Sequence, residues 1–142
     1  MLVAGLLVAI SALLLPGQAM ADQAGDATYS TDLVNASRAA YGVNWLTPDS
    51  ELQAVAQRQA DRMAGSGYIF HSYDLGGQLS WGWSAWAENV GYGPSVDWIH
   101  GAFMGSGHHA ANILGSSFNY VGVGVAYGYD GSVYVAQVFG RW

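Results

Sequence analysis

Two histidines and one glutamate are the residues of this sequence best suited to chemistry: His71, Glu88 and His109. Only 10% of the residues are charged, so each carboxylate in an apolar stretch, such as Glu88 beside Trp86, stands out. Imidazole titrates near neutral pH and can transfer protons or bind metal. A carboxylate in contact with it can fix its tautomer or complete a coordination sphere. We predict that these three side chains, called the trio below, meet in one cleft.

Each member of the trio also has a structural interpretation. His71 follows a predicted helix end, where histidines often form structural hydrogen bonds. Glu88 lies among apolar residues and could accept backbone N–H bonds, because burying an unpaired carboxylate is costly. His109 lies one helical turn before Asn112, whose amide could brace a neighbouring loop. The residues alone leave a metal site and a structural hydrogen-bond network both open.

The other two histidines are predicted to be surface residues. His108 adjoins His109 and would point about 100° away from it on a helix. His100 falls on the face of a predicted helix that points away from Val96 and Phe103. The sequence has no cysteine, G-x-S-x-G elbow, glycine-rich phosphate loop or H-E-x-x-H pair. It therefore gives no hydrolase signature beyond the trio, and the residues leave open whether the protein is an enzyme.

Charge and composition exclude some classes of partner. The net charge is −6, lysine is absent, and the four arginines are scattered along the chain. Nucleic-acid binding needs a clustered cationic face, so we expect no nucleic-acid partner. Without cysteine, the fold cannot rely on disulfides and must be stabilised by its core. We expect a monomer.

The N-terminal segment is typical of a secretory signal. Residues 2–15 are almost wholly apolar, and a Pro-Gly-Gln breaker and an Ala-Met-Ala cleavage site ending at Ala21 follow. No Lys or Arg precedes the apolar run, which departs from the usual pattern. We predict a signal peptide over 1–21, a disordered leader over 22–29 and one domain over 30–142. The protein would then be secreted and extracellular, without a stable membrane anchor.

Helices followed by a hairpin are the elements expected to position the trio. Residues 76–94, rich in Gly, Trp and Ser, are expected to form a loop, with at most a short strand near Glu88. This order predicts an α+β fold with helices packed on a small antiparallel sheet. The apolar periodicity and capping residues predict helices over 30–41, 47–64 (capped by Thr47), 95–104 and from Ser106, and strands over 120–126 and 133–139.

Taken together, these segments resemble a bacterial CAP (SCP-like) domain. The superfamily includes cysteine-rich secretory proteins and plant pathogenesis-related proteins. The resemblance covers about residues 30–140 and rests mainly on the Ala-Glu-Asn triplet at Glu88 and the His-x-x-Asn-Ile-Leu run from His109. It implies a single-domain, three-layer α-β-α sandwich with the trio lining a cleft. Eukaryotic members carry a second acid three residues after a tryptophan; here Phe103 and Ser106 occupy those slots.

The resemblance implies a secreted binding module. The trio resembles the ligand set of an open zinc site, so all three are candidate ligands for Zn²⁺ or another divalent cation. Ser106, Asn112 and Trp86 are candidates to contact a small apolar or cell-wall-derived ligand. Two alternatives stay open: a metal-assisted peptide or ester hydrolase that uses the same cleft, and a structural or interaction protein in which the trio only ties loops together.

Aromatic residues are concentrated beside the presumed cleft. Trp81, Trp83, Trp86, Tyr92 and Trp98 fall within one short stretch. Exposed indoles offer stacking faces for sugars or an apolar bed for lipid. They could instead fill core space that the neighbouring glycines leave. The sequence favours core filling for most of them, with one or two lining a groove.

Overall fold

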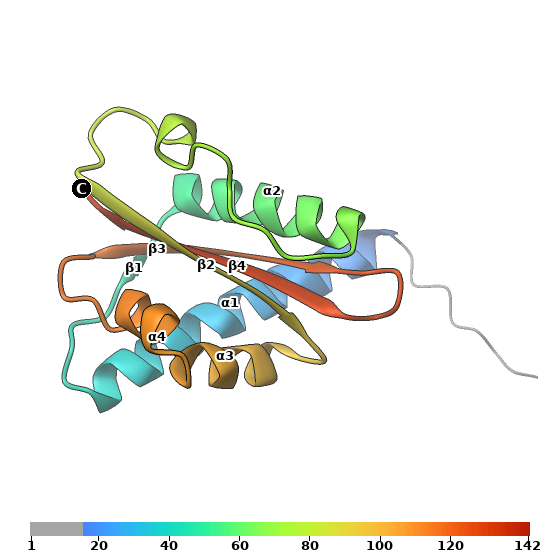
Figure 1. Ribbon diagram of the computed structural model, residues 1–142, viewed down its shortest axis with the longest axis horizontal. Helices are drawn as coiled ribbons and strands as arrows, with labels where there is room; N and C mark the ends of the chain where they lie inside the picture. Colours follow the sequence, from blue (N-terminus) through green and yellow to red (C-terminus); the bar gives the residue numbers. More distant parts are fainter. Residues whose placement is uncertain (1–15) are drawn as a thin grey trace, which may run out of the picture.

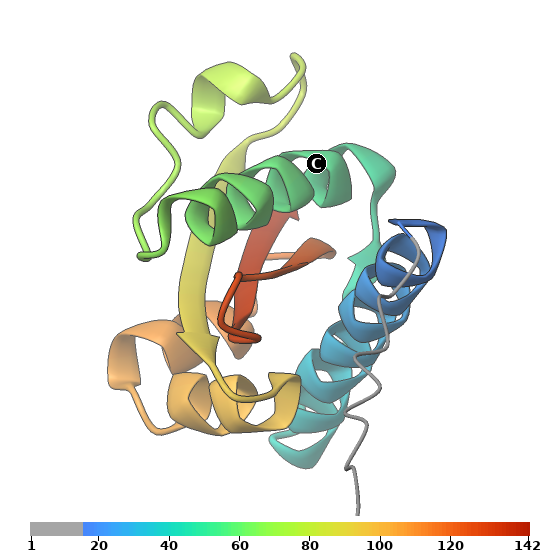
Figure 2. The same cartoon turned by 90° about the vertical axis from the view of Figure 1, so that its right-hand side faces the viewer.

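The computed structural model describes residues 16–142, which form a three-layer α-β-α sandwich (Figure 1). One helix, α2, covers one face of a four-stranded sheet, and α1, α3 and α4 lie on the other face (Figure 2). The predicted fold class is therefore confirmed. The helices are α1 (Pro16–Ala40), α2 (Ser50–Ser66), α3 (Val96–Met104), α4 (Gly107–Ile113) and a 3₁₀ turn over Gly76–Gln78.

The sheet has the strand order β1-β3-β4-β2. The three long strands pair antiparallel, and the β3–β4 pair is the predicted hairpin. A two-residue strand, β1, adds a parallel pairing to β3. The hairpin turn at Asp130-Gly131 joins β3 to β4, and Gly131 has a φ of 81°, which glycine adopts without steric cost. The strand bounds are β1 Thr47–Pro48, β2 Ala85–Gly93, β3 Tyr120–Tyr127 and β4 Val133–Arg141.

The first helix corrects the expectation of a disordered leader over 22–29. These residues belong to α1, which is 25 residues long. Ala27 is buried, and the Tyr127 hydroxyl donates to Asp26 at 2.8 Å, so this part of the helix packs against β3. The sequence did not indicate a packed helix here, because few side chains of residues 22–29 are large and apolar. Most of the predicted signal peptide, residues 1–15, lies outside the described residues, and cleavage after Ala21 stays a prediction.

The second helix begins close to its predicted start but has a different cap. The Asp49 carboxylate accepts the backbone N–H groups of Glu51 and Leu52, which satisfies two of the donors exposed at a helix start. Thr47, the expected cap, instead pairs with β3 through β1. The helix ends at Gly67 with a φ of 77°, as the Gly-Ser-Gly stop predicts.

The edge strand β2 corrects the loop expected over residues 76–94. It pairs with β4 along nine residues, from Ala85 to Gly93. Its glycines suggested a loop, but they serve close packing: a Cβ at Gly91 would come within 2.8 Å of the Phe103 ring on α3. The expected short strand near Glu88 is thus a full edge strand, and Glu88 lies at its centre.

Helix α2 packs closely on the middle of the sheet. A Cβ at Gly122 or Gly124 of β3 would collide with the backbone of α2 at Gln53 or Gln57. The glycines that alternate with valines in β3 therefore set the distance between helix and sheet. The valines Val121, Val123 and Val125 face the opposite core, which α1 and α3 cover.

Candidate functional site

Glu88 is buried on the α2 side of β2 and accepts hydrogen bonds through both carboxylate oxygens. Oε1 is 2.9 Å from Nδ1 of His71 and 2.8 Å from the backbone N of Ser72, and Oε2 accepts the Ser72 hydroxyl. The Glu88 side chain is only 4% exposed, whereas that of His71 is 59% exposed. Since a carboxylate only accepts, Nδ1 of His71 carries the proton. Within residues 16–142, Nε2 of this exposed ring makes no hydrogen bond.

Helix α2 holds the loop that carries His71. The buried amide of Gln59 donates to the carbonyl of Phe70, the residue before His71. Arg62, one turn further along α2, donates to Oε1 of Gln59 at 2.8 Å. The position of the His71 ring therefore depends on α2 as well as on Glu88. Gln59 and Ser72 were missed in the sequence, although Gln59 falls on the apolar stripe of α2, where a polar residue signals a buried partner.

Asn89 points to the opposite face of the sheet from Glu88, because successive residues of a strand alternate. Its Oδ1 accepts from Nδ2 of Asn112 at 2.9 Å, and its Nδ2 donates to the carbonyl of His109 at 3.1 Å. The same Nδ2 lies 3.1 Å from Oε1 of Gln137 on β4. Asn112 thus braces α4 against the edge strand, the structural alternative that the sequence left open for it.

His109 is held by Ser106 at the start of α4. The Ser106 hydroxyl lies 3.0 Å from Nδ1 of His109, and the Phe103 ring packs at 5.0 Å between centroids. Burial lowers the pKa of His109, and the positive charges of His108 and His71 lower it further. The ring is therefore neutral near pH 7, and in the part of the chain that the structure describes its Nε2 makes no hydrogen bond. Ser106 accordingly positions His109 rather than capping α4.

The structure pairs two members of the trio, His71 and Glu88, and places His109 on the other face of β2, so a cleft shared by all three stays a prediction. His71 contacts Glu88 on one face of β2. On the other face, the backbone carbonyl of His109 accepts a hydrogen bond from Asn89. Within residues 16–142, no three His, Cys, Asp or Glu side chains form a group that could hold a metal ion. Among the described residues no hydrogen bond engages Nε2 of either ring, whereas both oxygens of Glu88 accept hydrogen bonds.

The prediction that His100 is a surface residue is wrong. Its ring is half-buried between α3 and α1, and Nε2 lies 2.8 Å from the hydroxyl of Ser37. Its buried Nδ1 has no hydrogen-bond partner among the described residues. The expectation failed because His100 lies one helical turn after Val96 and one before Phe103, which places it on their side of α3, next to Ser37 of α1. His108 is exposed, as predicted.

Arg38 is a buried cation that the sequence did not single out. Its guanidinium is only 1% exposed and donates to three backbone carbonyls, those of Asn44, Ile113 and Gly115. These contacts join the end of α1 to the end of α4. Arg38 thereby helps to fix the helix that carries His109.

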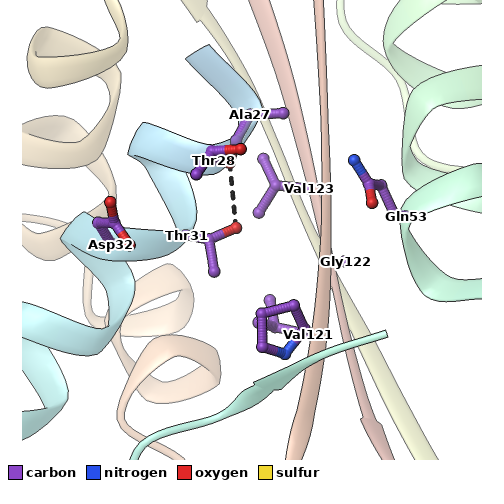
Figure 3. Close-up of a pocket in the computed structure, with 9 residues that line it drawn as sticks. Ala27, Thr28, Thr31, Asp32, Gln53, Val121, Gly122 and Val123 are labelled. Carbon is purple, nitrogen blue, oxygen red and sulfur yellow. Dashed lines mark hydrogen bonds between the residues drawn. The ribbon is translucent and has the colours of Figure 1, made fainter. Parts of the chain in front are cut away.

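A separate hollow of about 110 Å³ lies at the opposite edge of the sheet (Figure 3). It lies between α1, α2 and β3, and Thr31 on its wall donates to the carbonyl of Ala27. Gln53 of α2 and Val121 to Val123 of β3 complete most of the wall. None of the trio lines this hollow, so it offers no support for the predicted site. No helix within the described part of the chain is long and apolar enough to cross a membrane.

The fold and the histidine-lined edge define a small α-β-α sandwich of the CAP type. The profile of the family described as "CAP: Cysteine-rich secretory protein family" matches residues 31–139. The chain belongs to this family. No curated protein matches the chain at the significance required.

Solved structures of CAP-type proteins share the fold. An extracellular SCP-domain protein of Bacillus anthracis is 24% identical, with a TM-score of 0.76 over 93% of this chain and 45% of its own. A cysteine-rich secretory protein of Staphylococcus aureus is 26% identical, with a TM-score of 0.71 over 84% and 39%. NaASP2, solved with Zn²⁺, is 11% identical, with a TM-score of 0.62 over 82% and 80%. The chain spans less than half the length of the two bacterial proteins.

Proposed function

We propose that this CAP domain is an exported binding module that holds a divalent cation between Nε2 of His71 and Nε2 of His109. The observation that carries the proposal is that each ring is fixed through Nδ1, by Glu88 and by Ser106, while Nε2 is left free. Neutral imidazole is a good ligand for zinc and similar ions. The lowered pKa of His109 keeps that ring in its ligating form near neutral pH.

Glu88 serves this site as a positioning residue. Its oxygens are occupied by His71 and Ser72, an arrangement in which a carboxylate orients a metal-binding histidine and raises its basicity. Two protein ligands leave the other positions of a tetrahedral ion to water or to a ligand, so binding is weak. The zinc in the NaASP2 structure supports the choice of Zn²⁺ as the first ion to test.

The adjoining surface is proposed to receive a small apolar or wall-derived ligand. Trp86 is 45% exposed and lies on the same face of β2 as Glu88, two residues away. Export is supported by the predicted signal segment and by the Bacillus anthracis structure, which is described as extracellular. The cation would then lie at one end of a ligand surface that runs along β2.

Calorimetric titration with zinc chloride tests the cation site. We expect saturable heat with the wild type and none with His71→Ala plus His109→Ala. His108→Ala is the matched control, because His108 is exposed and adjoins His109 without sharing its contacts. Wild-type protein without zinc heat, or equal heat from the double variant, would contradict the proposal.

Metal-assisted hydrolysis is the second candidate function. The His71–Glu88 pair favours this function, because an exposed imidazole that is hydrogen-bonded to a carboxylate can act as a general base. Glu88→Gln keeps the shape of the side chain and removes its charge. If the site is catalytic, this variant should hydrolyse peptide and ester substrates more slowly than the wild type; equal rates would exclude catalysis through this pair.

A further inference from the structure

The loop between α2 and β2 stands out beyond α2 (Figure 2). Its residues and the start of β2 line an aromatic hollow. Trp81, Trp83 and Trp86 line it, and we call it the tryptophan hollow. Trp81 is 96% exposed and Trp86 is 45% exposed, whereas Trp83 is partly buried against α2. The cation site at the histidines uses neither Trp81 nor Trp83. Large exposed aromatic surfaces of this kind mark binding sites.

Two of the indole rings are held in place without any ligand. Nε1 of Trp83 donates to the Glu51 carboxylate at 2.9 Å, and its ring meets Trp142 edge-on at 5.1 Å. Trp86 lies directly over Gly76, where an added Cβ would come within 2.5 Å of the ring. Because these rings are already ordered, a ligand that stacks on them would lose little binding energy to side-chain ordering.

Ser80 and Ser84 line the hollow, and Glu51 contacts two of its lining residues, Ser80 and Trp83. The Glu51 carboxylate accepts the backbone N–H and hydroxyl of Ser80 as well as Nε1 of Trp83. These hydrogen bonds hold the pKa of Glu51 below its usual value, so the carboxylate is ionised and can accept a hydrogen bond from a further hydroxyl. Ser84 donates its hydroxyl to the carbonyl of Arg141 and keeps its lone pairs as acceptors.

This combination matches a sugar ring better than a lipid chain. A pyranose presents an apolar C–H face for stacking on an indole and a rim of hydroxyls for hydrogen bonds. A fatty or sterol ligand needs a continuous aliphatic wall, yet among the described residues lining the hollow Leu79 is the only aliphatic side chain larger than alanine. The net charge of −6 and the ionised Glu51 disfavour acidic polysaccharides.

We propose that the tryptophan hollow binds an uncharged pyranose oligosaccharide. Trp81 and Trp86 stack on sugar faces, and Glu51 with Ser84 accepts hydrogen bonds from sugar hydroxyls. This proposal goes beyond the cation site and does not depend on it. It assigns a ligand class to a surface beside Glu88, since Trp86 and Glu88 lie on the same face of β2.

Titration of the full chain with chitotetraose and cellotetraose tests the proposal, with tryptophan fluorescence and calorimetry as readouts. We expect saturable binding of at least one of the two sugars. Trp81→Ala and Trp86→Ala should each weaken it about tenfold, the effect of losing one aromatic stacking contact. Trp98→Ala is the matched control, because Trp98 is 57% exposed on α3 and lies outside the hollow.

Three results would overturn the proposal. They are the absence of binding of both sugars to the wild type, equal weakening by Trp98→Ala and Trp81→Ala, and binding only to phosphatidylcholine vesicles. Trp81 is almost fully exposed, so its replacement should leave the circular dichroism spectrum unchanged. The His71→Ala, His109→Ala double variant should bind sugar with wild-type affinity, which separates failure of the cation site from failure of the sugar site.

Discussion

Hydrogen bonding determines what each residue of the trio can do. Glu88 is engaged by His71 and Ser72, and His109 is engaged by Ser106, so the two Nε2 atoms are the groups left for a ligand. The sequence correctly drew attention to three unusual residues in an apolar chain. It could not indicate that Ser72 also binds Glu88, because Ser72 belongs to no pattern of its own.

Replacing Glu88 should destabilise the fold. Glu88→Ala leaves the backbone N–H of Ser72 and Nδ1 of His71 without their acceptor, which we expect to lower the free energy of unfolding by about 1–3 kcal/mol. Glu88→Gln retains one acceptor oxygen, so it should lower the free energy of unfolding by less than Glu88→Ala does. Urea denaturation measures both variants; an unchanged unfolding midpoint for Glu88→Ala would show that the network does not stabilise the fold.

The half-buried His100 should make stability depend on pH. Burial lowers its pKa, and the nearby Asp97 opposes this only in part. The unfolded chain therefore binds the proton more tightly, with a pKa of about 6.5. The contribution of neutral His100 to the free energy of unfolding is complete above about pH 6.5. It is lost as the pH falls toward the lower pKa that His100 has in the folded protein.

His100→Asn removes this titration and tests it. Unfolding free energies measured between about pH 7.5 and 5 should fall less steeply for the variant than for the wild type. His109 titrates in the same direction, so part of the slope will remain. Equal slopes for the two proteins would contradict the role assigned to His100.

At the scale of the elements, glycines account for both a success and a failure of sequence reasoning. The β3–β4 hairpin was predictable because valines alternate with small residues around an Asp-Gly turn. The strand β2 was not predictable, because the glycines of residues 76–94 are typical of loops. The structure shows that Gly91 and Gly93 instead make room for the side chains of α3.

The close contact between α2 and β3 gives a direct test of this packing. Gly124→Ala would place a methyl group against the backbone of α2 at Gln57, which cannot move without shifting the helix. We expect a loss of about 1–3 kcal/mol in unfolding free energy. Gly101→Ala is the matched control on α3, where the new methyl meets nothing within 4 Å. It should be neutral or stabilising by up to ~1 kcal/mol.

On the scale of the whole molecule, the site is built where two layers meet around a sheet edge. α2 and its following loop bring His71 to one face of β2, and α4 brings His109 to the other (Figure 1). Arg38 and the Asn89–Asn112 pair tie α1, α4 and the edge strand together. The family resemblance implied a cleft lined by all three residues, and that shared cleft stays a prediction. Periodicity alone could not indicate the observed contacts, because they join segments far apart in the sequence.

Nitrogen-15 NMR of the histidine rings during a zinc titration tests the central claim most directly. Without zinc, His71 should show a proton on Nδ1, as its contact with Glu88 requires. With zinc, the Nε2 signals of His71 and His109 should move together to the metal-bound range, while those of His100 and His108 stay in place. Zinc shifts at His108 alone, or at neither His71 nor His109, would contradict the account.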